Sequence, residues 1–214
     1  MEKTVNYTTT NSYSTLNQLT NKTKNIWMVC HGLGYLSKYF IKYFEILDPT
    51  VNYVIAPQAP SVYYQDKAFK YVGANWFTRE NVAVAKSGIL NYLDEIYKTE
   101  IASVKTKDHR LILLGYSQGV SVICRWMAAR KIECDDLVLH SGGIPEELEA
   151  LDFKYLNNDT SVHLVCGRQD QYLTAQRVTA QMTLANNLFE KRSNTHFFDG
   201  KHEFNQALIK TIIG

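Results

Sequence analysis

The order of apolar and polar residues predicts buried strands that alternate with amphipathic helices from residue 26 onward. Short apolar runs, typical of strands covered on both faces of a sheet, occupy residues 26–30, 53–56, 110–114, 137–139, 162–166 and 195–198. Between and after these runs, apolar residues recur at helical spacing in segments at 36–47, 80–101, 117–130, 178–189 and 204–212, with a further short helix at 146–151. This alternation favours a mostly parallel sheet with helices on both faces.

Two segments depart from the alternation. Residues 4–16 are rich in Thr, Tyr, Val and Ser, with a turn signal at Asn11 and Ser12, and predict a short antiparallel hairpin at the sheet edge. Residues 57–78 predict a long irregular stretch. No repeat, linker or shift in composition divides the chain, so we expect a single domain over residues 1–214.

Composition argues against several classes of function. The net charge of +2, with both signs interspersed, gives no basis for binding nucleic acid. No apolar run approaches the roughly 18 residues of a membrane helix, and the N-terminal segment lacks the apolar core of a signal peptide. We therefore expect a cytoplasmic protein without stable membrane insertion. The cysteines form no CxxC pair and lie in or beside apolar runs, as reduced, buried thiols do.

A candidate nucleophile follows the strand expected at 110–114. Residues 115–119 read Gly-Tyr-Ser-Gln-Gly, a G-x-S-x-G pattern that is followed directly by an apolar helix. This setting of strand, turn and helix lifts a serine hydroxyl clear of the sheet, and the two glycines let strand and helix approach closely. The alternative is a glycine-rich turn in which Ser117 only caps the helix. The context favours Ser117 as the nucleophile of an α/β-hydrolase.

A serine nucleophile needs a base to accept its proton. His202 lies just after the last expected strand, where this fold places its histidine. His140, at the end of a strand, is a second candidate, whereas His31 is expected to hold its glycine-rich turn. The remaining histidines precede or lie within strands and are expected to be exposed or packed: His109, His163 and His196.

The acid of the triad should follow a strand between the nucleophile and the base. Asp170 does so, three residues after Gly167. Asp199 is the rival, because it is close to His202 in sequence, whereas Asp136 precedes its strand and so belongs at the wrong edge of the sheet. Two backbone N–H groups should bind the oxyanion. We expect one from Gln118 and the other from the loop at 31–34, His-Gly-Leu-Gly.

Seven segments in order resemble the phospholipase/carboxylesterase family of small α/β-hydrolases, which includes bacterial carboxylesterases and acyl-protein thioesterases. The resemblance runs from about Trp27 to the C-terminus. It rests on HGLG at 31–34, VIAPQAP at 54–60, NWF at 75–77, GYSQG at 115–119, SGG at 141–143, GRQDQYL at 167–173 and GKHEF at 200–204.

The resemblance implies Ser117, Asp170 and His202 as the triad and the N–H groups of Leu33 and Gln118 as the oxyanion hole. It also implies that no cofactor is used, and that a homodimer is one assembly to test. No cluster of His, Asp or Glu shows metal-ligand spacing, so we expect no metal. The sequence departs from the family pattern at Tyr35, where Asp is usual, and at Gln171, where Pro is usual.

These features predict a serine carboxylesterase that acts on short to medium acyl esters, with a small-molecule ester as its partner. Tyr35, Trp76 and Phe77 are candidates for the wall of the substrate pocket, although aromatic residues in 57–78 could instead anchor that segment to the core. The alternative enzymes are a lysophospholipase and an acyl-protein thioesterase. A non-catalytic ligand-binding relative is the alternative of another class, and the presence of all three triad residue types in order speaks against it.

Overall fold

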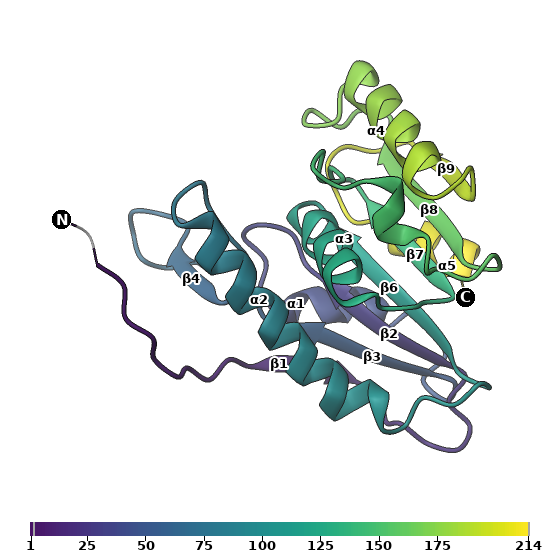
Figure 1. Cartoon of the computed structure of the whole chain (residues 1–214), viewed down its shortest axis with the longest axis horizontal. Coiled ribbons are helices and arrows are strands. Elements are labelled where there is room, and N and C mark those ends of the chain that lie inside the picture. Colours follow the sequence, from purple (N-terminus) through teal and green to yellow (C-terminus); the bar gives the residue numbers. More distant parts are fainter. Residues whose placement is uncertain (2, 214) are drawn as a thin grey trace.

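The computed structural model describes residues 1 and 3–213 and is built on a seven-stranded sheet (Figure 1). The strand order is β1-β3-β2-β6-β7-β8-β9. Six strands are parallel, and only β1 runs antiparallel, to β3. The bounds are β1 Tyr13–Leu16, β2 Asn25–Cys30, β3 Asn52–Pro57, β6 Arg110–Tyr116, β7 Asp136–His140, β8 Ser161–Gly167 and β9 Ser193–Phe198. The expected α/β-hydrolase fold class is confirmed.

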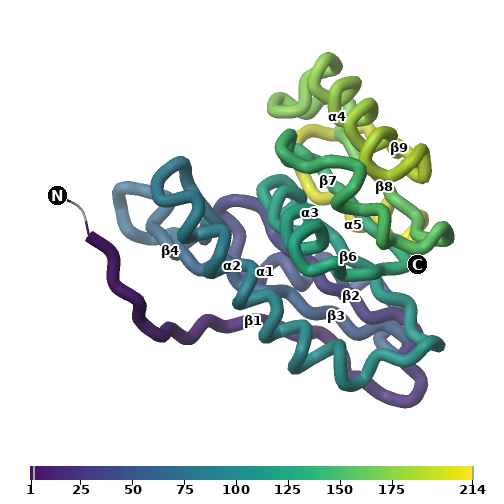
Figure 2. The backbone as a smooth tube through the Cα atoms, in the orientation of Figure 1, coloured from purple at the N-terminus to yellow at the C-terminus, as the bar shows by residue number. Residues whose placement is uncertain are grey.

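Helices cover both faces of the sheet, as Figures 1 and 2 show. One face carries α2, α3 and α4, and the other carries α1, η1 and α5. The bounds are α1 Ser37–Phe40, η1 Ile41–Phe44, α2 Val82–Tyr97, η2 Lys98–Ala102, α3 Gln118–Arg130, η3 Ala150–Phe153, α4 Ala175–Leu188 and α5 Gln206–Ile213. No helix of the described residues is long and apolar enough to cross a membrane.

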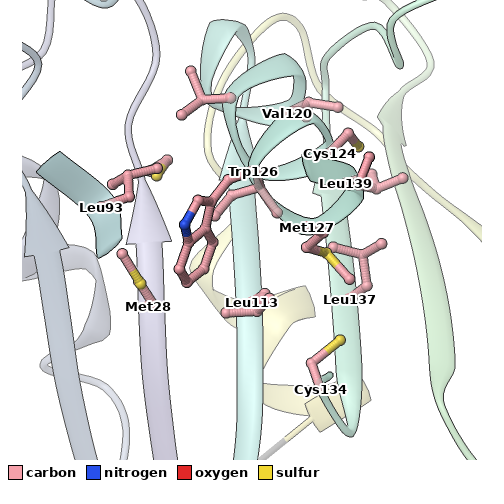
Figure 3. Close-up of a cluster of buried hydrophobic side chains, with 14 of the residues drawn as sticks. Met28, Leu93, Leu113, Val120, Cys124, Trp126, Met127, Cys134, Leu137 and Leu139 are labelled. Carbon is pink, nitrogen blue, oxygen red and sulfur yellow. The ribbon is translucent and has the colours of Figure 1, made fainter. Parts of the chain in front are cut away.

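The larger core lies between the sheet and the face that carries α2, α3 and α4. Helix α3 is apolar nearly all round because it is buried between the sheet and α2, and Figure 3 shows its Trp126 and Met127 beside Leu113 and Leu137 of the strands. The Trp126 indole donates to Asp94 of α2 at 2.9 Å, so its polar atom is satisfied in the core. Helix α3, which follows Ser117, is therefore held rigidly on the sheet.

The N-terminal segment forms an antiparallel pair, but with a partner other than the expected one. Within residues 4–16 only β1 is a strand, and it pairs with β3 in the register Tyr13↔Pro57 to Leu16↔Val54. Residues 3–12 form neither helix nor strand. The segment 3–10 extends away from the sheet (Figure 2), whereas Asn11 and Ser12 are hydrogen-bonded to Gln58 after β3. The polar run at 4–10 has little apolar surface to bury, whereas Leu16 packs against the core beneath η1.

Two further segments differ from their predictions. Residues 57–78 contain a two-stranded hairpin, β4 Ser61–Tyr64 and β5 Val72–Asn75, which lies outside the main sheet. The short helix expected at 146–151 is wrong in its position, because the helical turn begins at Ala150. Glu149 and Asp152 form a capping box there, each side chain accepting from the other's backbone N–H, and this fixes the start of the turn.

The strand order indicates where on the sheet a functional site would form, namely at the carboxyl ends of β2 and β6. After β2 the chain moves outward to β3, and later returns to form β6 on the other side of β2. The loops that leave β2 and β6 therefore diverge at their carboxyl ends. In open α/β sheets such a switch point is where ligands bind. The loop at 31–34 and the turn at Ser117 both leave the sheet at this point.

Candidate active site

Ser117 occupies a strained turn between β6 and α3. Its backbone angles are φ 52° and ψ −116°, a conformation that costs energy for a residue with a side chain. The flanking glycines make the turn possible. A Cβ on Gly115 would lie 2.5 Å from the Val120 nitrogen, and one on Gly119 would lie 2.0 Å from the Cys30 carbonyl oxygen. The sequence therefore builds a turn that presents the serine at the cost of local strain.

The structure brings Ser117, His202 and Asp170 together, the set expected from the sequence. The Ser117 hydroxyl lies 2.9 Å from Nε2 of His202, and Nδ1 of His202 lies 2.7 Å from Oδ2 of Asp170. Because the carboxylate accepts the Nδ1 proton, the neutral imidazole presents its lone pair on Nε2 to the hydroxyl. This arrangement can draw the proton from the serine as it attacks a carbonyl carbon.

Asp170 is held as a buried acceptor. Its side chain is 0% exposed, and its Oδ1 accepts the backbone N–H groups of Tyr172 and Leu173 at 2.8 and 3.1 Å. These bonds orient the carboxylate and compensate its desolvation. The rival acid Asp199 is 88% exposed and lies 3.4 Å from Arg168, away from His202. Asp136 begins β7 at the opposite edge of the sheet and pairs with Arg110 at 2.7 Å.

Two further histidines are buried and neutral near the site. His31 accepts the Ala59 N–H on Nε2 at 3.1 Å and donates from Nδ1 to the Gly32 carbonyl at 2.8 Å, so it holds its turn as expected. Burial lowers its pKa to about 4, against the opposing effect of the Gly32 hydrogen bond. His140 accepts the Asn205 N–H on Nε2 at 3.0 Å, and burial, with the nearby His202 charge, lowers its pKa to about 3. Its contacts lie behind the triad rather than at the serine.

The remaining histidines lie away from Ser117. His163 and His196 face each other across β8 and β9, with Nδ1 and Nε2 3.1 Å apart. His109 lies in the loop before β6 and accepts the Thr106 N–H at 3.0 Å. Within the described residues, none of these three histidines is hydrogen-bonded to the triad, in agreement with the sequence-based expectation that they are exposed or packed.

The two expected oxyanion donors lie beside Ser117. Leu33 and Gln118 both line the cavity that contains the serine hydroxyl. The glycine loop approaches the nucleophile closely, because a Cβ on Gly32 would lie 3.0 Å from the Ser117 Cβ. The loop is fixed from behind by the Trp76 indole, which donates to the His31 carbonyl at 2.8 Å. The role of the Leu33 and Gln118 N–H groups stays a prediction.

The cavity in front of Ser117 has a volume of about 470 Å³. Its wall combines loops from the ends of β2, β6, β7, β8 and β9 with the starts of α3 and α4. The lining residues are Leu33, Ser117, Gln118, Ser121, Ser141, Gly142, Gly143, Tyr172, Leu173, Arg177 and His202. A place in the cavity wall was not predicted from the sequence for Tyr172 or Arg177. Their signal is positional: Tyr172 lies in the acid loop, and Arg177 lies just after it at the start of α4, at the edge where the triad forms.

The three residues expected to line the substrate pocket lie elsewhere. Trp76 is 1% exposed and packs against His31 beneath the glycine loop. Phe77 lines a different groove, between α2 and α3, and Tyr35 packs edge-on against Tyr116 behind the triad. An aromatic ring loses more contact with water by packing under the loop than by lining an open cavity. The anchoring alternative therefore describes Trp76 better than the pocket-wall prediction.

The cysteines do not contribute to the site. All four are buried and unpaired, in agreement with the thiols expected from the sequence. Burial raises the pKa of Cys166 to about 11 and that of Cys124 to about 12. Within residues 1 and 3–213, no group of three or more His, Cys, Asp or Glu side chains has a geometry that could hold a metal ion.

Solved structures similar to this chain share its fold at low sequence identity. Acyl-protein thioesterase 2 of Zea mays has a TM-score of 0.64 at 14% identity, covering 95% of this chain and 96% of that chain. The Bacillus cereus carboxylesterase has a TM-score of 0.63 at 15% identity, covering 94% and 91%. A carboxylesterase from Mesorhizobium loti has a TM-score of 0.65 at 16% identity, covering 87% of each chain. No curated protein matches the chain by sequence.

The family comparison extends over almost the whole chain. The family model described as Phospholipase/Carboxylesterase matches residues 11–213, from two residues before β1 to the end of α5. The match includes the elbow at 115–119, the acid loop and the histidine loop. This chain therefore belongs to the phospholipase/carboxylesterase family of α/β-hydrolases.

Proposed function

We propose that the protein is a serine carboxylesterase that hydrolyses short to medium acyl esters through an acyl-enzyme intermediate. The observation that carries the proposal is the hydrogen-bonded chain from Ser117 through His202 to Asp170, with distances of 2.9 and 2.7 Å. Membership in the phospholipase/carboxylesterase family supports the same chemistry.

The first half of the reaction forms the acyl-enzyme. Oγ of Ser117 attacks the ester carbonyl carbon while Nε2 of His202 takes its proton, and Asp170 stabilises the imidazolium that results. The carbonyl oxygen becomes an oxyanion that accepts from the N–H groups of Leu33 and Gln118. When the carbon–oxygen bond to the alcohol breaks, His202 gives its proton to the leaving alkoxide.

The second half releases the acid. Water takes the place of the alcohol, loses a proton to His202 and attacks the acyl carbon. The bond to Oγ then breaks, and the proton returns from His202 to Ser117. No redox partner is needed, and the proposal assigns no cofactor to the reaction.

The small cavity favours esters with short acyl chains. Its volume of about 470 Å³ is in the range of sites for small molecules, and its wall is formed by loops without a large apolar lid. A thioester or a lysophospholipid uses the same acyl transfer, so acyl-protein thioesterase and lysophospholipase activities are the alternatives. A ligand-binding role without catalysis is the alternative of another class.

Labelling with a fluorophosphonate separates catalysis from ligand binding alone. We expect stoichiometric labelling of the wild type, none of Ser117→Ala, and a loss in kcat for ethyl butyrate on the order of 10⁴ or more in Ser117→Ala and in His202→Ala. Asp170→Asn should lose somewhat less.

Lys107→Gln is the matched surface control, because Lys107 lies in the loop before β6 at the opposite edge of the sheet. It should keep wild-type turnover. Near-normal turnover by purified Ser117→Ala would contradict the serine mechanism. A dead Asp199→Asn beside an active Asp170→Asn would show that the acid is misassigned. Activity on an acyl thioester far above that on the ester would favour the thioesterase alternative.

A further inference from the structure

The cavity in front of Ser117 has one permanently charged side chain in its wall, the guanidinium of Arg177. Among the described residues that line the cavity, none is Asp or Glu. A cation without a counter-charge in a small cavity favours a ligand group that is negatively charged. A site built for wholly neutral esters has no need of such a charge.

The guanidinium is oriented by the acid loop. Its Nη1 donates to the main-chain carbonyl of Tyr172 at 2.6 Å, and the Tyr172 ring meets the His202 imidazole edge-on with 4.8 Å between ring centres. The same loop is pinned from below by Asp170, which accepts the Tyr172 N–H. Arg177 is thus held on the His202 side of the cavity, and its position is coupled to the triad through one short loop.

The charge of Arg177 is not cancelled by a neighbour. Among residues 1 and 3–213, no carboxylate oxygen lies within 4.0 Å of its guanidinium nitrogens, and the guanidinium makes one hydrogen bond, to a main-chain carbonyl. The nearest acid of the site, Asp170, is buried behind His202 and accepts three N–H groups of its own. Helices α3 and α4 both begin beside the cavity. The N-terminal ends of their dipoles are positive and add to the positive electrostatic potential of Arg177 in the cavity.

We propose that Arg177 is a specificity-determining residue that selects small esters carrying a carboxylate, either on the acyl part or on the alcohol part. The inference rests on the proposed esterase function. The substrate carboxylate binds the free edge of the guanidinium while the ester carbonyl lies at Ser117. A six-carbon chain fits a cavity of about 470 Å³.

The test uses pairs of esters that differ only in the charge. On the acyl side the pair is monoethyl adipate and ethyl hexanoate, which share a six-carbon acyl chain. On the alcohol side the pair is the butyrate ester of glycolate and ethyl butyrate, which share a two-carbon alcohol part. We expect kcat/KM to favour the charged member of at least one pair by about tenfold at low salt. The preference should shrink as salt is raised, since Arg177 is exposed and ions screen an exposed charge.

Three variants assign the preference to Arg177. Arg177→Gln should lower the charged-to-neutral ratio about tenfold, Arg177→Lys should retain most of it, and Arg177→Glu should turn it below one. Lys22→Gln removes the same charge from the loop before β2, at the far edge of the sheet, and should leave the ratio unchanged. The pair that responds shows on which side of the ester the carboxylate lies.

Two results would overturn the proposal: a wild-type ratio near one in both pairs, or a preference that Arg177→Gln leaves intact. Either is distinguishable from failure of the esterase function, because the neutral esters report that function separately. If the neutral and charged esters are all inert, the proposed function has failed rather than the role of Arg177.

Discussion

The Tyr116 hydroxyl donates a hydrogen bond to the main-chain carbonyl of His202 at 3.2 Å, and its ring stacks on the imidazole with 5.6 Å between centres. Tyr116 directly precedes Ser117 in the chain. The turn that presents the nucleophile therefore also contacts His202, the base that accepts the proton of Ser117. The ring is 2% exposed and packs on Phe40 and Phe204 behind the triad. His202 is thus positioned from behind by β6 as well as by Asp170.

Removing this hydroxyl should affect kcat more than KM. Tyr116→Phe keeps the ring stack and deletes a neutral hydrogen bond, which contributes about 1 kcal/mol. If that energy goes into placing the imidazole, kcat falls about fivefold. Steady-state kinetics and urea unfolding of the same preparations measure the two effects.

Tyr155→Phe is the matched control for this change. The Tyr155 hydroxyl lies 3.0 Å from the carbonyls of Met127 and Ile132, away from the cavity. This variant should lose similar stability and keep wild-type kcat. Equal kcat in both variants would show that the Tyr116 hydroxyl contributes to stability alone.

Gly119 should not tolerate a methyl group, although Ala is the better helix former. A Cβ there would lie 2.0 Å from the Cys30 carbonyl oxygen, so α3 or β2 must shift. Such overpacking costs about 1–3 kcal/mol or more, and it moves Ser117 relative to the glycine loop. We expect Gly119→Ala to be less stable and nearly inactive.

Gly88 should tolerate a methyl group, in contrast to Gly119. It lies inside α2, which covers the same face of the sheet as α3. The residue is exposed and has open space where a Cβ would be. Gly88→Ala should raise the free energy of unfolding by about 0.5–1 kcal/mol and leave turnover unchanged. If Gly119→Ala and Gly88→Ala both stabilise the protein, α3 does not approach β2 at Gly119 as closely as the structure shows.

The sequence predicted those features that depend on local patterns. The six parallel strands follow from apolar runs, and the meeting of Ser117, Asp170 and His202 follows from the rule that carboxyl ends of parallel strands share one edge. The hairpin β4–β5 was not predicted, since Val62, Tyr64 and Val72 stay exposed and give no burial pattern. The pairing of β1 with β3 was not predicted either. The two strands are about 40 residues apart in sequence, and their pairing depends on which strand of the folded sheet has an unpaired edge.

The cavity wall was harder to predict than the triad. Trp76 and Phe77 were predicted to line the pocket because they are aromatic. Their actual positions depend on how the segment that contains them folds back under His31. Arg177 has no motif of its own and reaches the cavity because α4 begins there. Substrate selection thus rests on tertiary placement, which composition and spacing do not specify.

Stability should fall as the pH drops below about 6.5, because His31 and His140 are buried in neutral form. Burial lowers their folded-state pKa values to about 4 and about 3, whereas histidine in an unfolded chain titrates near about 6.5. Below that pH the unfolded chain binds more protons than the folded one, so acid favours unfolding. Protonation would also place an N–H on Nε2 against the backbone N–H that each imidazole now accepts.

Each histidine contributes a slope of up to about 1.4 kcal/mol per pH unit from about 6.5 downward. Urea unfolding at intervals from pH 7.5 to pH 5 measures it. Glu147, whose pKa the Arg125 hydrogen bond lowers to about 2, loses its contribution only below about pH 4.5, outside this window. His140→Gln should reduce the slope. A free energy of unfolding that stays level from pH 7.5 to pH 5 would contradict the neutral, buried state of both histidines.

The length of the acyl chain that the cavity accepts should depend on Gly143. This glycine lines the cavity, and a Cβ on it would meet no atom within 4 Å, so a larger side chain projects into free space. Each buried CH₂ of an acyl chain contributes about 0.8 kcal/mol, and chain-length preference therefore reports how much enclosed surface is available. We expect the wild type to show the highest kcat/KM for short to medium esters and no increase in rate at lipid interfaces. Gly143→Val should move the optimum to shorter chains and leave the free energy of unfolding within about 1 kcal/mol of the wild type.

Gly142 separates this effect from a general loss of activity. A Cβ on Gly142 would lie 2.3 Å from the Ser117 carbonyl oxygen and 2.5 Å from the Val120 side chain, so Gly142→Ala distorts the elbow itself. It should lower kcat for every chain length alike, whereas Gly143→Val changes the profile. A series of p-nitrophenyl esters from acetate to palmitate, with a triolein emulsion beside it, measures both variants. An optimum at palmitate in the wild type would mean that the acyl chain lies outside this cavity, along a surface to which Gly143 does not belong, and the lysophospholipase or thioesterase alternative would then be preferred.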